Sequence, residues 1–214
     1  MDEEIAIIDN KTRREKIINF LLKNKKKLIL IIAILVLIPL VFFSYQIYKN
    51  KNKQWIANKY NSTIINFEGG DKLKAAEIMK EIINDKDPTY SPLALYFLID
   101  NNIQVSNEET NKFFDIIIDE VKLKKEIKNL VIYKKALFNS EFTDENSLIT
   151  ILNPLINSES IWTSHALYLV AEYFYFKNEK QKSKEFYERI ISLNNADENI
   201  LRNAQKKLNR NFSE

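Results

Sequence analysis

Residues 164–191 read SHALYLVAEYFYFKNEKQKSKEFYERII, and this stretch predicts the fold more sharply than any other part of the chain. Large residues recur in it at spacings of three or four, which is the period of an α-helix. They are Leu167, Val170 and Phe174 before Asn178, and Tyr187 and Ile190 after it. One small residue lies among the large ones in each half: Ala171 before Asn178 and Ser183 after it. We therefore expect two antiparallel helices that approach closely at the small residues, with a turn near Asn178.

This alternation of small and large positions is typical of the tetratricopeptide repeat, a helix pair of about 34 residues. Other parts of residues 49–214 match less well. Ala75, Met79 and Ile82 follow the turn at Gly69-Gly70 with the right spacing, Ala94 marks a second pair, and the pair around 130–153 is degenerate. Only one helix pair matches the repeat pattern well. A generic helical bundle therefore remains the alternative to a repeat array.

Helix-start and helix-stop residues divide the rest of the chain. Asp71 is expected to cap a helix, Ser91 to cap another with Pro92 in its first turn, Ser106 to form a capping box with Glu109, and Ser160 to open a further helix. The expected helices are 53–67, 71–84, 91–101, 106–120, 124–138, 143–153, 161–177, 179–193 and 197–209. The fold class is thus all-α: a single transmembrane helix, an α-solenoid of four tetratricopeptide-like hairpins, and a C-terminal capping helix.

Leu28–Tyr48 reads LILIIAILVLIPLVFFSYQIY, which is 21 residues without a charge, 15 of them Leu, Ile, Val or Phe. A helix of this length spans about 31 Å, the thickness of a bilayer core. Pro39 is expected to kink it, and Tyr48 lies where interfacial aromatic residues gather. A cleaved signal peptide is the alternative, but the stretch is too long and has no small-x-small cleavage site.

The Lys/Arg distribution predicts the orientation of this span. Eight such residues precede it in residues 1–27, and four follow it up to Lys59. Because positive residues stay in the cytoplasm, we expect a cytoplasmic tail over 1–27, the span over 28–48, and a periplasmic domain over 49–214 of an inner-membrane protein. The basic lead-in Arg13–Lys27 fits either an interfacial amphipathic helix or a stop-transfer flank.

Composition excludes several classes of protein. The chain has no cysteine, one histidine and two adjacent glycines, so thiolate metal sites, disulfides and glycine-rich nucleotide loops are absent. The net charge of +3 belongs to residues 1–27, and the remaining residues balance, which argues against a nucleic-acid-binding domain. His165 has no nucleophile in a position to form a triad. We expect no enzyme activity, cofactor or small-molecule substrate.

Four side chains of the best repeat are the candidate partner-binding residues. In the repeat frame His165, Tyr168, Glu172 and Tyr175 occupy the positions that face the concave groove of such arrays. Tyrosines there make a large, rigid and amphipathic surface for a peptide. The alternative is that these tyrosines pack against the neighbouring repeat.

The order of parts resembles the YfgM-like family of bacterial inner-membrane proteins. The resemblance rests on an acidic start, a basic lead-in containing KIINFLLKN, the single span, Trp55 soon after it, TYSPLALYFL at 89–98, and the repeat at 164–191. It departs from the family in its sparse glycine and alanine and in its weak first repeats.

The resemblance implies a non-enzymatic protein that associates with the SecYEG translocon and with the periplasmic chaperone PpiD. Such a protein would help newly translocated chains reach periplasmic chaperones. The alternative is a structural scaffold for another envelope assembly, such as a division or secretion apparatus, and a membrane-tethered enzyme is a third possibility.

Overall fold

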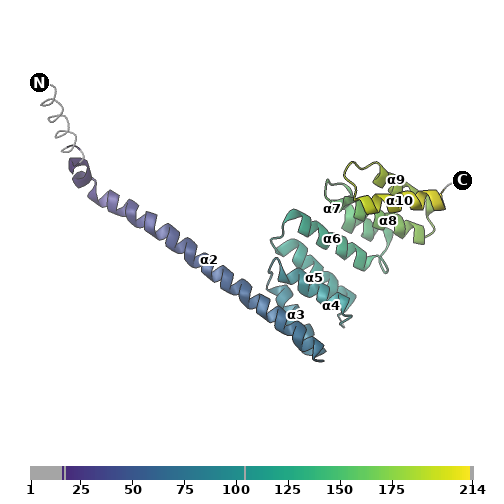
Figure 1. Cartoon of the computed structure of the whole chain (residues 1–214), viewed down its shortest axis with the longest axis horizontal. Helices are drawn as coiled ribbons and strands as arrows, with labels where there is room; N and C mark the ends of the chain where they lie inside the picture. Colours follow the sequence, from purple (N-terminus) through teal and green to yellow (C-terminus); the bar gives the residue numbers. More distant parts are fainter. Residues whose placement is uncertain (1–15, 17, 104, 213–214) are drawn as a thin grey trace, which may run out of the picture. The chain divides into compact units, whose positions relative to one another are not determined.

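The computed structural model describes residues 16, 18–103 and 105–212. Within them every regular element is a helix and no strand occurs, so the all-α prediction is confirmed for this part of the chain (Figure 1). The acidic start and the first residues of the basic lead-in lie outside the described residues. The chain divides into two compact units, Met1–Trp55 and Ile56–Glu214.

Helix α2 covers Lys25–Glu68, which is 44 residues. It joins the predicted span and the predicted helix 53–67 into one continuous helix. The reason is local: residues 49–52 hold only Lys and Asn, with no glycine or proline to end a helix. Pro39 lies inside α2 and does not end it, as is common for a proline in a membrane-crossing helix.

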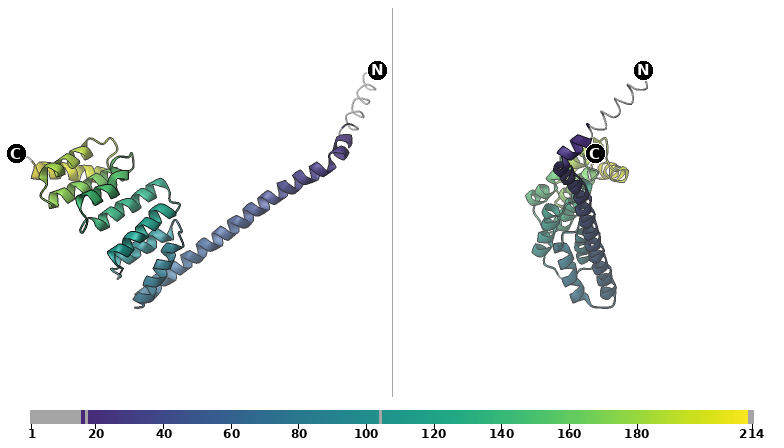
Figure 2. Two further views of the ribbon diagram at one scale, coloured as in Figure 1. Left: turned by 180° about the vertical axis from the view of Figure 1, so that it is seen from behind. Right: turned by 90° about the vertical axis from the view of Figure 1, so that its left-hand side faces the viewer.

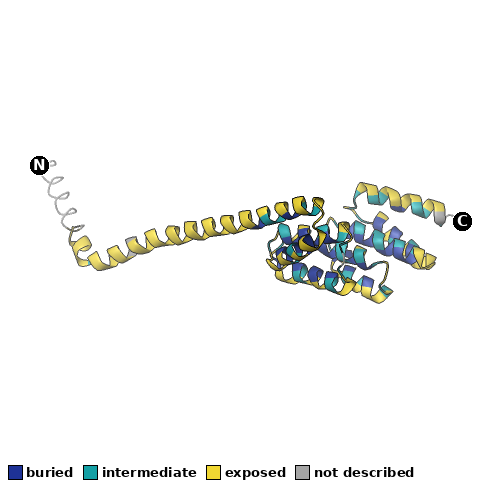
Figure 3. Cartoon of the chain, turned by 90° about the horizontal axis from the view of Figure 1, so that it is seen from below, coloured by how far each residue is buried: buried dark blue, intermediate teal, exposed yellow. Residues whose placement is uncertain are grey.

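The first part of α2 exposes apolar side chains on all sides, and Figure 3 shows them as a continuous run of exposed residues. A stretch within Ala33–Glu68 has a mean hydropathy of 1.4, and none of it is buried. By length and composition α2 can therefore cross a membrane. Leu28, Pro39 and Tyr48, the residues chosen to mark the span, all lie in this helix.

Eight further helices follow among the described residues. They are α3 (Lys72–Asn84), α4 (Tyr90–Asp100), α5 (Asn107–Glu120), α6 (Lys125–Asn139), α7 (Glu145–Ile156), α8 (Thr163–Phe176), α9 (Lys180–Ile191) and α10 (Glu198–Asn211). From α3 onward each helix packs on the next, and α3 also meets α5, α6 meets α8, and α8 meets α10. The left view of Figure 2 shows them stacked in chain order, with α3 and α10 at opposite ends of the row.

Two predicted caps, Asp71 and Ser106, are confirmed, and Asp144 and Asp197 cap the helices that were expected to start near 143 and 197. Asp71, Ser106, Asp144 and Asp197 each accept a hydrogen bond from a backbone N–H in the first turn of α3, α5, α7 and α10. Such caps satisfy donors that have no partner inside the helix.

Three predicted helix ends are wrong. Ser91 does not cap α4: it lies inside the helix, buried, and its hydroxyl donates to the Ile82 carbonyl at 2.8 Å. Asp87 serves as the acceptor at that end, for the N–H groups of Thr89 and Tyr90. Pro154 does not end α7, which runs to Ile156. Ser160 lies three residues before α8, where its hydroxyl accepts from the Trp162 N–H at 3.1 Å and donates to Glu126 on α6.

Several connections share one turn geometry. Gly70, Lys86, Asn102 and Asn178 have positive φ directly after α2, α3, α4 and α8. At three of them the next residue's N–H also reaches back to the carbonyl five residues earlier, as with Glu179 and Phe174 at 2.9 Å. This is the Schellman motif, which ends a helix and reverses the chain. The prediction that Gly69-Gly70 ends the first helix is confirmed.

The core of Ile56–Glu214 consists of two clusters that meet at α6. One holds buried residues from Ile56 to Val131, and the other holds buried residues from Ile132 to Ala204. Figure 3 shows the buried positions on the inward faces of the stacked helices. Val131 and Ile132 are neighbours in α6 but belong to different clusters, so α6 covers both halves of the stack.

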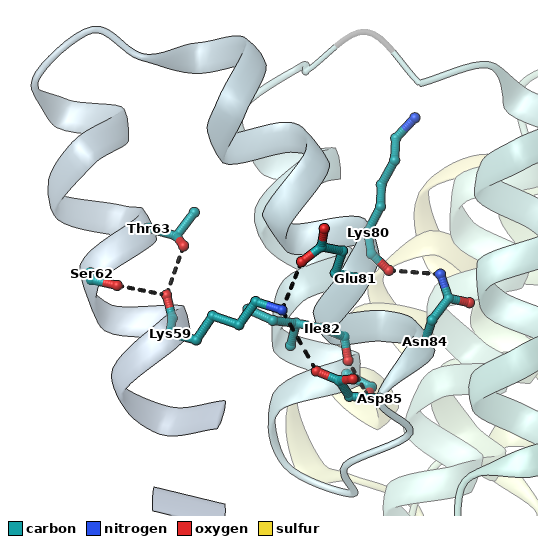
Figure 4. Close-up of polar contacts among 9 residues, drawn as sticks. Lys59, Ser62, Thr63, Lys80, Glu81, Ile82, Asn84 and Asp85 are labelled. Atoms are coloured by element: carbon teal, nitrogen blue, oxygen red, sulfur yellow. Dashed lines mark hydrogen bonds and ion pairs between the residues drawn. The ribbon is translucent and has the colours of Figure 1, made fainter. Parts of the chain in front are cut away.

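Lys59 joins the last part of α2 to the end of α3 through ion pairs. The Lys59 ammonium lies 2.8 Å from Glu81 and 3.9 Å from Asp85, and its own carbonyl accepts from the Thr63 hydroxyl (Figure 4). Ile56, three residues before Lys59, is 1 % exposed and belongs to the first core cluster. The last part of α2 therefore belongs to the folded unit as its first helix.

Candidate interaction surface

A groove of about 670 Å³ runs between α6 and α8. We call it the α6–α8 groove. It is lined by Tyr133 and Leu137 of α6 with Ser140 and Glu141 directly after that helix, and by Tyr168, Leu169, Glu172, Tyr173 and Phe176 of α8 with Lys177 directly after it. Most of these side chains are aromatic or aliphatic, with one carboxylate on each wall. Apolar walls with a few placed polar groups are typical of surfaces that bind organic ligands or peptide side chains.

Close packing of α8 on α9 decides which face of α8 lines the groove. Ala171 and Ser183 are fully buried, and the Ser183 hydroxyl donates to the Ala171 carbonyl at 2.8 Å. Leu167, Phe174 and Tyr187 fill the space beside this contact, each about 1 % exposed or less. The opposite face of α8 is left for the groove.

Glu172 ties the groove to the two helices behind it. It accepts hydrogen bonds from the Tyr187 hydroxyl on α9 and from the Lys207 ammonium on α10, the latter at 2.9 Å. Lys207 also lies over the Tyr175 ring, 5.4 Å from its centroid. Because the carboxylate has two donors, it is oriented before any ligand arrives.

The tyrosines of the groove stay protonated in neutral solution. Burial raises the pKa of Tyr133 and of Tyr168, and the Glu172 charge raises that of Tyr168 further. Tyr187 behaves likewise: burial, followed by the Glu172 carboxylate, raises its pKa. These hydroxyls are therefore hydrogen-bond donors, and the walls carry no phenolate charge.

The structure brings two of the four predicted residues, Tyr168 and Glu172, into the groove. Tyr175 lies outside its lining and packs on the Phe212 ring at 6.2 Å. His165 also lies outside the lining, but its ring contacts Tyr133 and Trp162 at centroid distances of 5.9 and 5.2 Å. Its Nδ1 atom is buried and has no hydrogen-bond partner among the described residues.

The α6 wall of the groove was missed at the sequence level because that helix pair looked degenerate. The signal was present: Tyr133 and Tyr168 are 35 residues apart, and so are Ala136 and Ala171. Ala136 is fully buried like Ala171. Tyr133 thus holds the position in α6 that Tyr168 holds in α8, and both line the same groove.

Leu137 extends the apolar surface beyond the groove. Its side chain is 47 % exposed and also lines two hollows on the α4 side, of about 610 and 150 Å³. The smaller hollow includes Tyr96, whose ring carries the Lys134 ammonium at 4.5 Å. Burial raises the pKa of Tyr96 as well. The hollows between α4, α6 and α8 therefore adjoin one another at Leu137.

Within the described residues, no group of three or more His, Cys, Asp or Glu side chains is placed to hold a metal ion. Comparisons with models of protein families, with curated proteins and with solved structures find no match to this chain.

Proposed function

We propose that this chain is a membrane-anchored, non-enzymatic interaction module, and that it binds protein segments in the α6–α8 groove. The groove itself is the observation that carries the proposal. It combines exposed apolar side chains with tyrosine hydroxyls and an oriented carboxylate. An extended segment of a partner can bury apolar side chains there while its backbone bonds the polar groups, which is how tyrosine-rich surfaces bind peptides.

We further propose that Ile56–Glu214 is an array of four tetratricopeptide-like hairpins closed by α10. Three observations support this arrangement. Schellman turns recur after α2, α4 and α8. Small buried residues recur in the first helices of the later pairs, at Ala94, Ala136 and Ala171. Alternate helices α6 and α8 touch, and so do α8 and α10. In such an array the first helices of successive pairs form one concave face.

The proposed partners are the SecYEG translocon and a PpiD-type periplasmic chaperone. The resemblance to the YfgM-like family supports this assignment, together with a helix that is apolar enough to anchor the domain in the inner membrane. An anchor raises the effective concentration of the groove at the membrane surface, where translocated chains emerge. With this higher effective concentration, a moderate affinity of the groove for each translocated segment is enough for binding.

The test is site-specific photocrosslinking in intact membranes. A photoreactive residue replaces Leu137 in the groove, and a second variant carries it at Leu73, which is exposed on α3. The groove position is expected to capture translocon or chaperone subunits and the Leu73 position is not. Capture of division or secretion-apparatus proteins without any translocon subunit would instead support the scaffold function. Equal capture from both positions would show that the groove is not the binding site and would contradict the proposal.

A further inference from the structure

Four lysines gather where α5 passes into α6. Lys122 and Lys124 lie in the connection, and Lys125 and Lys128 lie in the first turn of α6. We call these four residues the lysine edge. The first three are exposed, and Lys128 is half-buried. Four like charges within seven residues repel one another and the positive end of the α6 dipole, so this arrangement costs stability unless an anion compensates it.

The surrounding carboxylates do not compensate these lysines. No member of the lysine edge has a carboxylate within 4.0 Å among the described residues, whereas Lys80, Lys112 and Lys135 each form such a pair elsewhere. Four acidic residues lie nearest to the lysine edge in sequence or across the Ser160 contact, and two of them are bonded to other groups. Glu120 pairs with Lys86, Glu126 accepts from the Ser160 hydroxyl at 2.7 Å, and Asp119 and Glu159 are exposed without a lysine partner.

Two exposed isoleucines accompany the lysines. Ile127 is 44 % exposed and Ile161 is 61 % exposed. They belong to one patch because their neighbours are bonded: Glu126 accepts from Ser160, and its carbonyl accepts from the Trp162 indole at 3.0 Å. The first turn of α6 and the connection before α8 thus present lysine charge and aliphatic side chains together.

The same side of Ile56–Glu214 receives the chain from α2. Lys59 pairs with Asp85, and the rings of Tyr60 and Tyr90 lie 5.6 Å apart, so the start of this unit adjoins the α3–α4 connection. The next contact along that side joins Lys86 of this connection to Glu120, directly before the lysine edge. Only residues 49–55 separate the predicted span from Ile56. They belong to helix α2, in which seven residues rise about 10 Å, so the first residue of this unit follows closely on the predicted span.

We propose that the lysine edge binds the anionic headgroups of the membrane that holds the anchor, with Ile127 and Ile161 entering the interfacial region. Clustered lysines beside a membrane are attracted by anionic lipid, and exposed aliphatic side chains add apolar burial. An acidic protein segment would satisfy the charge but gives no role to two isoleucines at the surface. The inference rests on the membrane anchor of the proposed function, and not on the groove or its partners.

Because the chain has no cysteine, a single reporter can be placed at will. Ile161→Cys in the full chain is labelled with an environment-sensitive fluorophore and reconstituted into vesicles. One set is phosphatidylcholine alone, and the other is an equal mixture of phosphatidylcholine and phosphatidylglycerol. We expect blue-shifted emission and several-fold slower quenching by aqueous iodide only in the mixture. Salt at about 1 M should reverse the shift, because screening then acts within about 3 Å.

Replacing all four lysines of the lysine edge with Gln should return the label to a water-like spectrum and restore the several-fold faster quenching by iodide that is expected in phosphatidylcholine alone. The matched control replaces Arg202, Lys206 and Arg210, three exposed basic residues on α10, with Gln and should keep the shift. Circular dichroism confirms that both variants are folded.

Three results would overturn the proposal: water-like emission in the anionic vesicles, an equal shift in phosphatidylcholine, or a shift that appears only on adding polyglutamate. Resistance of the protein to alkaline carbonate extraction reports on the anchor separately. A protein that is stripped by carbonate yet still shifts with added anionic vesicles would refute the anchor while supporting the lysine edge.

Discussion

The Ser183 hydroxyl on α9 donates a 2.8 Å hydrogen bond to the Ala171 carbonyl on α8, and both residues are fully buried. A side chain as short as serine reaches a neighbouring helix backbone only where the two helices nearly touch. Small residues on both sides of the crossing allow this approach. The contact also turns the face that carries Tyr168 and Glu172 toward α6.

Ala171→Leu is expected to lower the free energy of unfolding by about 1–3 kcal/mol, because the larger side chain forces α8 and α9 apart. Ser183→Ala keeps the volume and removes one hydrogen bond, so it should cost about 1 kcal/mol. Thermal unfolding of the full chain in detergent measures both. Gln181→Leu, on the exposed side of α9, serves as the control for added bulk. A loss in the control equal to that of Ala171→Leu would refute the packing explanation.

Glu172→Ala is expected to destabilise the docking of α10. It leaves the Tyr187 hydroxyl without its acceptor and the Lys207 ammonium without its counter-ion. An unsatisfied buried hydroxyl costs about 1–3 kcal/mol. Hydrogen exchange should show faster exchange in α9 and α10 and unchanged exchange in α3 and α4. Glu188→Ala, at an exposed position on α9, is the control. Unchanged protection of α10 would contradict the proposed role of Glu172.

Stability is expected to fall at alkaline pH through Tyr96 and Tyr187. Burial raises the pKa of both above the ordinary value near 10. Below that value both states hold the proton and stability is unaffected. Above it the unfolded chain releases protons that the folded chain retains, so stability falls by up to roughly 1.4 kcal/mol per pH unit for each tyrosine. Denaturant titrations above pH 10 should show a shallower decline for Tyr187→Phe, and an unchanged slope would contradict the assignment.

Leu137→Glu is expected to abolish partner capture while leaving the fold intact. The side chain is 47 % exposed and lies where the groove meets the hollows beside α4. A carboxylate there places a second charge beside Glu141 in the apolar lining and disfavours binding of apolar segments. Copurification from membranes, compared with Leu73→Glu, measures the effect. Equal recovery of partners with both variants would indicate that binding uses another face.

The orientation of the anchor is tested with a reporter that is active only outside the cytoplasm, fused after Glu214. We expect activity, because eight Lys/Arg residues precede the span and four follow it. Changing Lys23, Lys25, Lys26 and Lys27 to Gln equalises the two sides and should give mixed orientation, with reporter activity roughly halved. A stable fusion that is silent with the natural lysines would reverse the predicted topology.

Local signals predicted much of the fold. Asp71 and Ser106 were identified as helix caps from sequence, and the starts of α7 and α10 were predicted to within two residues, because a cap involves residues only two or three apart. The same reasoning failed at Ser91 and Ser160, whose hydroxyls bond groups nine and 34 residues away. A residue type that suits a cap also suits a buried contact between helices, and only the packing decides between them.

The sequence by itself determined the helical class, the apolar stretch that can cross a membrane, and the close pairing of the last repeat. Each of these depends on periodicity or on composition over a short range. Tertiary structure alone decided that α2 runs unbroken from Lys25 to Glu68, that Tyr168 and Glu172 share a groove with Tyr133 and Leu137, and that Tyr175 turns to Phe212 instead. A groove is formed by residues of two helices, and which faces meet depends on the packing of all the helices between them.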